Sequence, residues 1–394
     1  MLPVCGCIAL LLCLMARAGE TPAAKQQIVV LAWGGPPPAE ATVDRFRELA
    51  ECGFTHSFTG FSNATDMARA LDAAQAAGVK LLVSCPELQS DPQSTVRRFM
   101  NHPALGGYFL RDEPSAGDFD ALAKWTRSIQ QADPKHLVYI NLFPDYAHAQ
   151  QLGVPTYEKY VDQFVRKVPV PIISFDYYPI IGKTVRPSWY HNLQVIASAA
   201  ESAHKPFWAF ALSLRHYGYA PATVANLREQ VFSDLAYGAQ AIEYFTYWAS
   251  PGLSDDAPID SHGKRTAVYD HVKQVNAEIR ALSPVFLGSK VLWTRHTGDP
   301  LPPGATRFKP KPPVDGLSTE GTGAVVSLLE KTRQRFLVIV NRDIERPMSL
   351  RVLLDPTTAA SEIRKDGSTH PIGSREFSAQ CEPGDLRILC WSKP

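Results

Sequence analysis

The chain has 394 residues with a formal net charge of +1, and 45% of its residues are hydrophobic. This length and composition are sufficient for one large buried core and a second, smaller one. Lysine and arginine are scattered along the chain rather than gathered in a basic block, which argues against a nucleic-acid partner held through phosphate contacts. We therefore expect a soluble globular protein whose ligand is neutral or mildly polar.

The chain begins with a short apolar run, residues 4–14, which is too short to span a bilayer as a helix. Ala16-Arg17-Ala18 follows with the small-x-small pattern that signal peptidase accepts. We predict a secretory signal peptide over residues 1–18, a linker over residues 19–27, and a secreted or periplasmic protein without a transmembrane segment once the leader is removed. Because no basic residue precedes the apolar run, an uncleaved anchor or a lipoprotein signal is the alternative.

From residue 28 onward, apolar strands alternate with amphipathic helical segments, which is the pattern of βα units around a parallel sheet. Glycines such as Gly78 and Gly238 are expected to end helices, and Thr156 to begin one. Eight such units over residues 28–284, without a glycine-rich phosphate loop after the first strand, favour a closed (β/α)8 TIM barrel over an open doubly wound sheet. The strands are expected at residues 28–33, 55–59, 80–85, 107–110, 137–141, 172–177, 207–212 and 241–247.

Over residues 285–394 the pattern changes to alternating strands separated by Pro- and Gly-rich turns. This pattern predicts a small C-terminal antiparallel β-sandwich. We expect it to be a structural cap on the barrel, with carbohydrate binding as the alternative. Its strands are expected at residues 290–294, 323–329, 336–341, 349–354 and 386–391.

Removal of the leader would leave four cysteines, Cys52, Cys85, Cys381 and Cys390. They are too few and too dispersed for a disulfide scaffold. We expect buried free thiols.

In a (β/α)8 barrel the carboxyl ends of the strands converge on one mouth, where substrates bind. The fourth strand ends in Asp112-Glu113-Pro114, and paired acids at such a position are suited to general acid and base catalysis. The other strand ends offer aromatic rings, which stack on sugars, together with polar groups that bind hydroxyls and few metal ligands. We therefore expect a carbohydrate substrate and neither a metal ion nor another cofactor. The residues expected at the mouth are Trp33, Asp112, Glu113, Asn141, Asp176, Tyr178, Arg215, His216, Tyr247 and Trp248.

Three motifs over about residues 28–283 carry a resemblance to a known family. They are Tyr108-x-x-x-Asp112-Glu113-Pro114 on strand four, Asp176-Tyr177-Tyr178-Pro179 after strand six, and Tyr244-x-x-Tyr247-Trp248 after strand eight. Together they resemble the (β/α)8 glycoside hydrolases of the large clan of retaining β-glycosidases, in which a β-sandwich after the barrel is also common. The resemblance implies that Glu113 is the general acid/base. It also implies that Asp112, in place of the clan's asparagine, contacts a sugar hydroxyl beside the cleaved bond.

The chain departs from this clan at the end of strand seven, where residues 208–216 contain no acid to serve as the nucleophile. Asp176 is the favoured second carboxylate, either as nucleophile or as base for a water. A carboxyl separation of about 5–5.5 Å would indicate retention, and one of roughly 6.5–9.5 Å inversion. Glu243, early in strand eight, is a weaker candidate. We predict a secreted glycoside hydrolase that cleaves O-glycosidic bonds of an oligo- or polysaccharide with Glu113 as proton donor.

Two alternatives belong to other classes of function. The barrel could bind glycans without cleaving them, because the usual nucleophile is missing. An acyl hydrolase using Ser213 and His216 is weaker, since no Gly-x-Ser-x-Gly elbow surrounds the serine.

Overall fold

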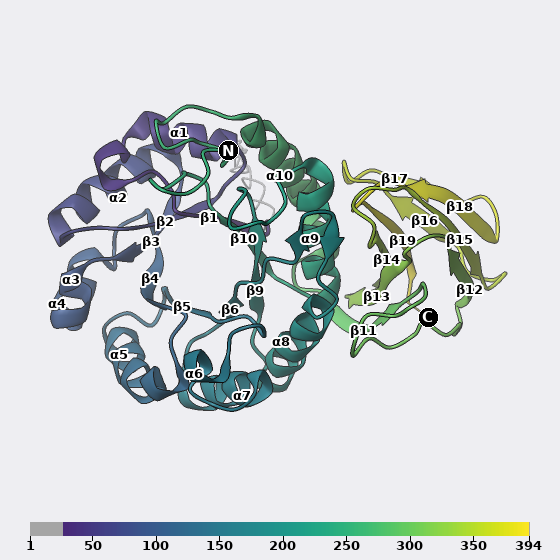
Figure 1. Ribbon diagram of the computed structural model, residues 1–394, viewed down its shortest axis with the longest axis horizontal. Helices are drawn as coiled ribbons and strands as arrows, with labels where there is room; N and C mark the ends of the chain where they lie inside the picture. Colours follow the sequence, from purple (N-terminus) through teal and green to yellow (C-terminus); the bar gives the residue numbers. More distant parts are fainter. Residues whose placement is uncertain (1–26, 394) are drawn as a thin grey trace, which may run out of the picture.

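The computed structural model describes residues 27–393 and shows a closed barrel of eight parallel strands followed by antiparallel sheets (Figure 1). The predicted fold class, a (β/α)8 barrel with a C-terminal β-sandwich, is confirmed. The predicted signal peptide and residues 19–26 of the predicted linker lie outside the described residues. Across residues 27–393, no helix combines the length and apolar character needed to cross a membrane.

The barrel strands follow the order β1-β10-β9-β6-β5-β4-β3-β2, with β1 and β10 closing the circle. Each predicted strand corresponds to one of these, displaced at its ends by a few residues at most. Their bounds are β1 (Val29–Trp33), β2 (His56–Gly60), β3 (Lys80–Ser84), β4 (Leu105–Asp112), β5 (Leu137–Leu142), β6 (Ile173–Phe175), β9 (Phe207–Leu212) and β10 (Ala241–Phe245).

The helices surround the barrel and begin and end at residues of the expected kind (Figure 1). Gly78 and Gly238 end α2 and α9 in the left-handed conformation, and the Thr156 side chain accepts a hydrogen bond from the backbone of Lys159 at the start of α7. The helices are α1 (Val43–Glu51), α2 (Ala64–Ala77), α3 (Pro86–Ser90), α4 (Pro92–Phe99), α5 (Phe119–Ala132), α6 (Ala149–Leu152), α7 (Tyr157–Lys167), α8 (Trp189–Ala203), α9 (Val224–Tyr237) and α10 (Ala267–Phe286). Above β6, β7 (Ile180–Ile181) and β8 (Thr184–Val185) form a short hairpin.

The C-terminal sandwich consists of one sheet in the order β11-β13-β14-β19-β16-β17 and a second in the order β12-β15-β18. Five of its strands were predicted. The sequence did not reveal the other four strands, because their apolar and polar residues alternate less clearly or because they are very short. They are β12, β16, β17 and β18. The cysteines of residues 27–393 are free and buried, as predicted. The strands are β11 (Lys290–His296), β12 (Val314–Thr319), β13 (Ala324–Lys331), β14 (Gln334–Asn341), β15 (Met348–Leu354), β16 (Ala360–Ile363), β17 (Thr369–Pro371), β18 (Glu376–Cys381) and β19 (Leu386–Ser392).

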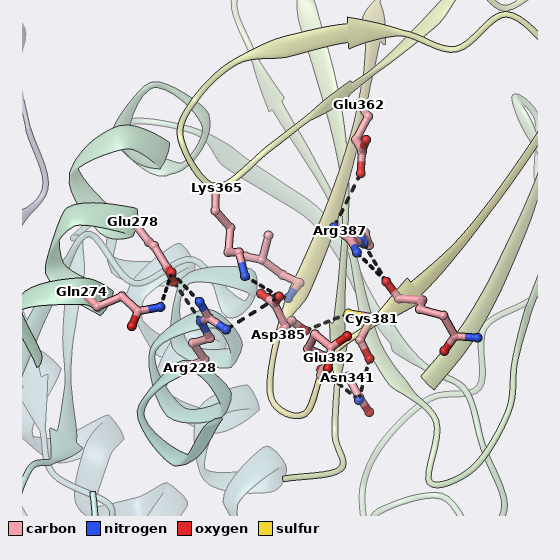
Figure 2. Close-up of polar contacts among 12 residues, drawn as sticks. Arg228, Gln274, Glu278, Asn341, Glu362, Lys365, Cys381, Glu382, Asp385 and Arg387 are labelled. Atoms are coloured by element: carbon pink, nitrogen blue, oxygen red, sulfur yellow. Dashed lines mark hydrogen bonds and ion pairs between the residues drawn. The ribbon is translucent and has the colours of Figure 1, made fainter. Parts of the chain in front are cut away.

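The sandwich packs beside the barrel wall, against α9, and does not cover the barrel opening (Figure 1). Figure 2 shows the polar contacts at this junction, where Arg228 of α9 binds Glu278 of α10 and also approaches Asp385 of the sandwich. Lys365 pairs with the same Asp385 from the sandwich side. Beside it, Gly384 approaches the backbone of α9 so closely that a Cβ atom would lie 2.2 Å from the carbonyl oxygen of Ala225.

Candidate active site

A cavity of about 380 Å³ opens at the carboxyl ends of the barrel strands. Three acids lie on one part of its lining, and aromatic rings, an arginine and a histidine make up most of the rest. Seven of the residues predicted for the mouth line it, together with six that were not predicted. The lining residues are Trp33, Asp112, Glu113, Asn141, Tyr146, Asp176, Tyr178, Arg186, Phe210, His216, Tyr217, Tyr219 and Phe245.

Asp112 and Glu113 are adjacent in the chain, yet both line the cavity. A bulge in β4 shifts its register with β5 between Phe109 and Arg111, so that Asp112 pairs with Asn141. Bulges of this kind turn a side chain toward a new direction and are frequent beside active sites. Glu113 then adopts φ +43°, a left-handed conformation that is rare for a non-glycine residue. These two irregularities direct successive carboxyls into one space, which regular alternation forbids.

Asp176 reaches the cavity from β6 by regular alternation, because it lies two residues beyond the inward-facing Ser174. Asn141, on the strand between β4 and β6, connects the acids of both neighbours. Its amide Nδ2 donates hydrogen bonds to Asp112 Oδ1 at 3.0 Å and to Asp176 Oδ1 at 3.1 Å. The cavity therefore contains a cluster of three carboxyls, two of which are held by one amide.

The surroundings of these carboxyls raise their pKa values. Burial, and then the negative charge of Asp112, raise the pKa of Glu113 to about 7, while a hydrogen bond with Asp176 acts in the opposite direction. Burial, and then the charges of Glu113 and Asp112, raise the pKa of Asp176 well above its usual range. Asp112 is exposed in the open mouth, although enough protein surrounds it for burial to raise its pKa as well. Because neighbouring acids titrate together, burial and mutual repulsion favour retention of a proton on the Glu113–Asp176 pair.

Aromatic side chains form the floor of the cavity around Trp33, the last residue of β1. Its ring centroid lies 5.3 Å from that of Phe210 and 5.2 Å from that of Phe109. Tyr178 lies at the side of the cavity, with its ring centroid 5.8 Å from that of Phe245. Its neighbour Tyr177 faces away, and its hydroxyl is hydrogen-bonded to that of Ser188. Flat apolar rings beside hydrogen-bonding acids are suited to a sugar, which has an apolar face and a polar edge.

Loop residues that sequence reasoning missed form the rim. Arg186, at the end of the β7–β8 hairpin, lies over the rings of Tyr146 and Tyr219, 4.6 Å and 5.4 Å from their centroids. Tyr217 is 89% exposed and has φ +41°, and its ring lies 4.0 Å from that of His216. The run His216-Tyr217-Gly218-Tyr219 directly after β9 was the available signal, since aromatic loops after barrel strands border the mouth.

Three residues expected at the mouth lie outside the cavity. Arg215 points to solvent and bonds to Asp256, with its backbone nitrogen at 2.8 Å and its Nε at 3.2 Å. Tyr247 and Trp248 are buried elsewhere: Tyr247 packs on Phe54, and Trp248 lies beneath the guanidinium of Arg45. The reason is that the strand was expected to run to residue 247, whereas β10 ends at Phe245, so Tyr247 and Trp248 follow the strand instead of ending it.

The structure also removes the basis for an acyl hydrolase. Ser213 is 0% exposed, and its hydroxyl donates a hydrogen bond to the backbone oxygen of Thr246 at 2.9 Å. Within residues 27–393 no cluster of three or more His, Cys, Asp or Glu side chains has a metal-binding arrangement.

Comparisons with known proteins support the fold. No family model and no curated protein sequence matches the chain. Among solved structures, a protein described as a glycoside hydrolase aligns with a TM-score of 0.54 and 12% identity over 93% of this chain and 92% of its own. A family 39 glycoside hydrolase from Bacteroides cellulosilyticus WH2 aligns with a TM-score of 0.53 and 11% identity over 92% of this chain and 80% of its own. An Anoxybacillus alpha-amylase aligns with a TM-score of 0.52 and 9% identity over 93% of this chain and 98% of its own. At such identities the likeness establishes a fold that glycoside hydrolases also have.

Proposed function

We propose that this protein is a glycoside hydrolase that cleaves O-glycosidic bonds of an oligo- or polysaccharide, with Glu113 and Asp176 as its catalytic carboxyls. The observation that carries the proposal is that these two acids, together with Asp112, line one cavity at the mouth of a barrel lined with aromatic rings. Hydrolysis of a glycoside needs one carboxylic acid to protonate the leaving oxygen and one carboxylate to attack the sugar or to activate water. A pair that holds one proton supplies both.

Glu113 is the proton donor in this proposal, because it is the more exposed of the two, whereas Asp176 is 7% exposed. Glu113 gives its proton to the glycosidic oxygen as the bond to the anomeric carbon breaks and the bonding electrons remain on that oxygen. Asp176 is then the carboxylate opposite the positive charge that develops on the sugar, and the hydrogen bond from Asn141 stabilises this charged form. Asp112 accepts a hydrogen bond from the Asn141 amide and can also accept one from a sugar hydroxyl.

The two carboxyls interact directly in the free protein. A substrate must therefore enter between the carboxyls and replace this interaction. A proton held by the pair is then available to the leaving group.

A panel of aryl glycosides and polysaccharides tests this proposal with the wild type, Glu113→Gln and Asp176→Asn. On the polysaccharides, whose leaving groups need a proton, both variants should lose at least about 100-fold in kcat/KM. The matched control is Glu320→Gln, an exposed acid of the sandwich, which should retain wild-type turnover. Full activity of Glu113→Gln would contradict the assignment. Binding of glycans by the wild type without any turnover would instead indicate a glycan-binding barrel.

We also propose that the protein is secreted or periplasmic, because residues 1–18 carry the pattern of a cleaved leader. N-terminal sequencing of the protein recovered outside the cytoplasm should begin at residue 19. A protein that keeps residue 1 would refute cleavage.

A further inference from the structure

A fully buried acid lies one layer below the cavity, inside the barrel. Glu243 of β10 is 0% exposed, and it lies two residues before Phe245, which lines the cavity. The neighbouring residues in register, Leu31 of β1 and Phe210 of β9, are uncharged. The charged group close enough to affect Glu243 is Asp112 of β4.

Hydrogen bonds connect this buried acid to the catalytic pair. The Tyr139 hydroxyl donates to Glu243 Oε2 at 2.6 Å, and Ser174 Oγ lies 2.7 Å from Glu243 Oε1. Ser174 Oγ also lies 3.1 Å from Asn141 Oδ1 and 2.7 Å from the Tyr139 hydroxyl. Because Asn141 Nδ2 binds both Asp112 and Asp176, the chain of contacts runs without a gap from the barrel interior to the cavity.

The number of hydrogens in this network determines the protonation of Glu243. Four contacts join Tyr139, Ser174, Glu243 and Asn141 Oδ1, but the two hydroxyls supply one hydrogen each. With Glu243 ionised, the single hydrogen of Ser174 would have to serve both the carboxylate and the amide oxygen. A proton on Glu243 Oε1 removes this competition: Glu243 donates to Ser174, Ser174 donates to Asn141, and Tyr139 donates to Glu243 Oε2. Three of the four contacts then have a hydrogen, and the contact between the Tyr139 and Ser174 hydroxyls has none, whereas the ionised form supplies only two.

We propose that Glu243, as a neutral carboxylic acid, is a positioning residue that acts through Ser174 to hold the Asn141 amide with both Nδ2 hydrogens on Asp112 and Asp176. Burial raises the pKa of Glu243 to about 8, which agrees with the hydrogen count. The ionised form favours the turned amide, in which Nδ2 donates to Ser174 and Oδ1 faces the two acids. This inference rests on the proposed function, because it concerns the geometry of the proposed catalytic acids.

The pH dependence of turnover separates a positioning role from a merely structural one. Glu243→Gln preserves the donor and acceptor pattern, since its Nε2 can donate to Ser174 and its Oε1 can accept from Tyr139. This variant should retain kcat within about threefold, whereas Ser174→Ala, which breaks the link to Asn141, should lose about tenfold or more. Above about pH 8, wild-type log(kcat/KM) should fall with a slope that steepens from about −1 to about −2, because two protons are lost, while Glu243→Gln stays near −1. A slope of −2 in Glu243→Gln, or full activity in Ser174→Ala, would overturn the inference.

A second measurement does not depend on activity. In wild-type protein labelled with ¹³C at glutamate carboxyls, Glu243 should have the chemical shift of a protonated acid at pH 7 and should titrate near pH 8. Burial also raises the pKa of the fully buried Glu229 to about 8, so the Glu243 signal is identified as the one that Glu243→Gln lacks. If glycosides are turned over but Glu243→Gln removes no signal of a protonated acid, the inference fails and the proposed function stands. If the signal is present but no glycoside is turned over, the proposed function fails and the hydrogen-bond arrangement stands.

Discussion

Replacement of Glu113 by glutamine should remove the titration that limits turnover near neutral pH. Glutamine keeps the size of the side chain but cannot deliver a proton to a leaving group. Because burial and Asp112 raise the pKa of Glu113 to about 7, its protonated fraction falls from about 90% at pH 6 to about 1% at pH 9. Wild-type kcat/KM should therefore fall at least roughly 100-fold over this interval for substrates that require protonation.

The leaving group provides the sharpest assay of this role. An alkyl glycoside needs a proton on its departing oxygen, whereas a dinitrophenyl glycoside releases a stable phenolate without one. Glu113→Gln should lose about 10²–10⁴-fold in kcat/KM on the alkyl glycoside, which corresponds to about 2.7–5.4 kcal/mol of transition-state stabilisation, and far less on the dinitrophenyl glycoside.

The pH profiles complete the experiment. In the Glu113→Gln profile the decline centred near pH 7 should be absent, and the fall above pH 8 attributed to Glu243 should be the decline that remains. Glu320→Gln should reproduce the wild-type profile. The reasoning would be refuted if Glu113→Gln lost equal activity on both glycosides or kept the decline centred near pH 7.

Three further outcomes are expected. Tyr217→Ala should raise KM for oligosaccharides about 3- to 10-fold without lowering Tm, because its 89% exposed ring offers a stacking surface and supports no core; an unchanged KM would exclude such contact. The first product should keep the anomeric configuration of the substrate by ¹H NMR, because the direct interaction of Glu113 with Asp176 favours the closer carboxyl separation of about 5–5.5 Å over the wider one of roughly 6.5–9.5 Å. An inverted first product would refute this spacing argument. Gly384→Ala should destabilise the junction with α9 by about 2–4 kcal/mol, since φ is +64° and the new Cβ would overlap the Ala225 carbonyl, whereas Gly373→Ala, with open space around it, should leave thermal unfolding unchanged.

The barrel could be predicted from the sequence because its strands are buried on both faces and appear as apolar runs that alternate with amphipathic helices. Asp176 and Tyr178, expected at the end of the sixth strand, do line the cavity. Tyr247 and Trp248 do not, because the eighth strand was expected to reach residue 247 and β10 ends at Phe245.

Other features of the site depend on contacts that local pattern does not contain. The bulge in β4 arises where its register with β5 shifts, which the sequence of β4 alone does not show. Without the bulge, Arg111 rather than Asp112 would face inward. Arg186 and Tyr219 reach the cavity because the β7–β8 hairpin bonds to the loop after β9, where Ile181 pairs with Tyr219. Contacts between loops that lie far apart in the sequence cannot be read from either loop alone.

The strand order gives a reason for the unusual pair of acids. In the resembling clan the catalytic carboxyls lie at the ends of strands four and seven, but here the corresponding end of β9 carries a buried serine. Glu113 and Asp176 follow β4 and β6, which are separated in the barrel only by β5. This proximity brings the two carboxyls close together and lets one residue of β5, Asn141, bind Asp112 at the end of β4 and Asp176 after β6. Because the orientation of that amide then affects Asp112 and Asp176 at once, the buried Ser174–Glu243 contact behind it becomes part of the same electrostatic unit as the cavity.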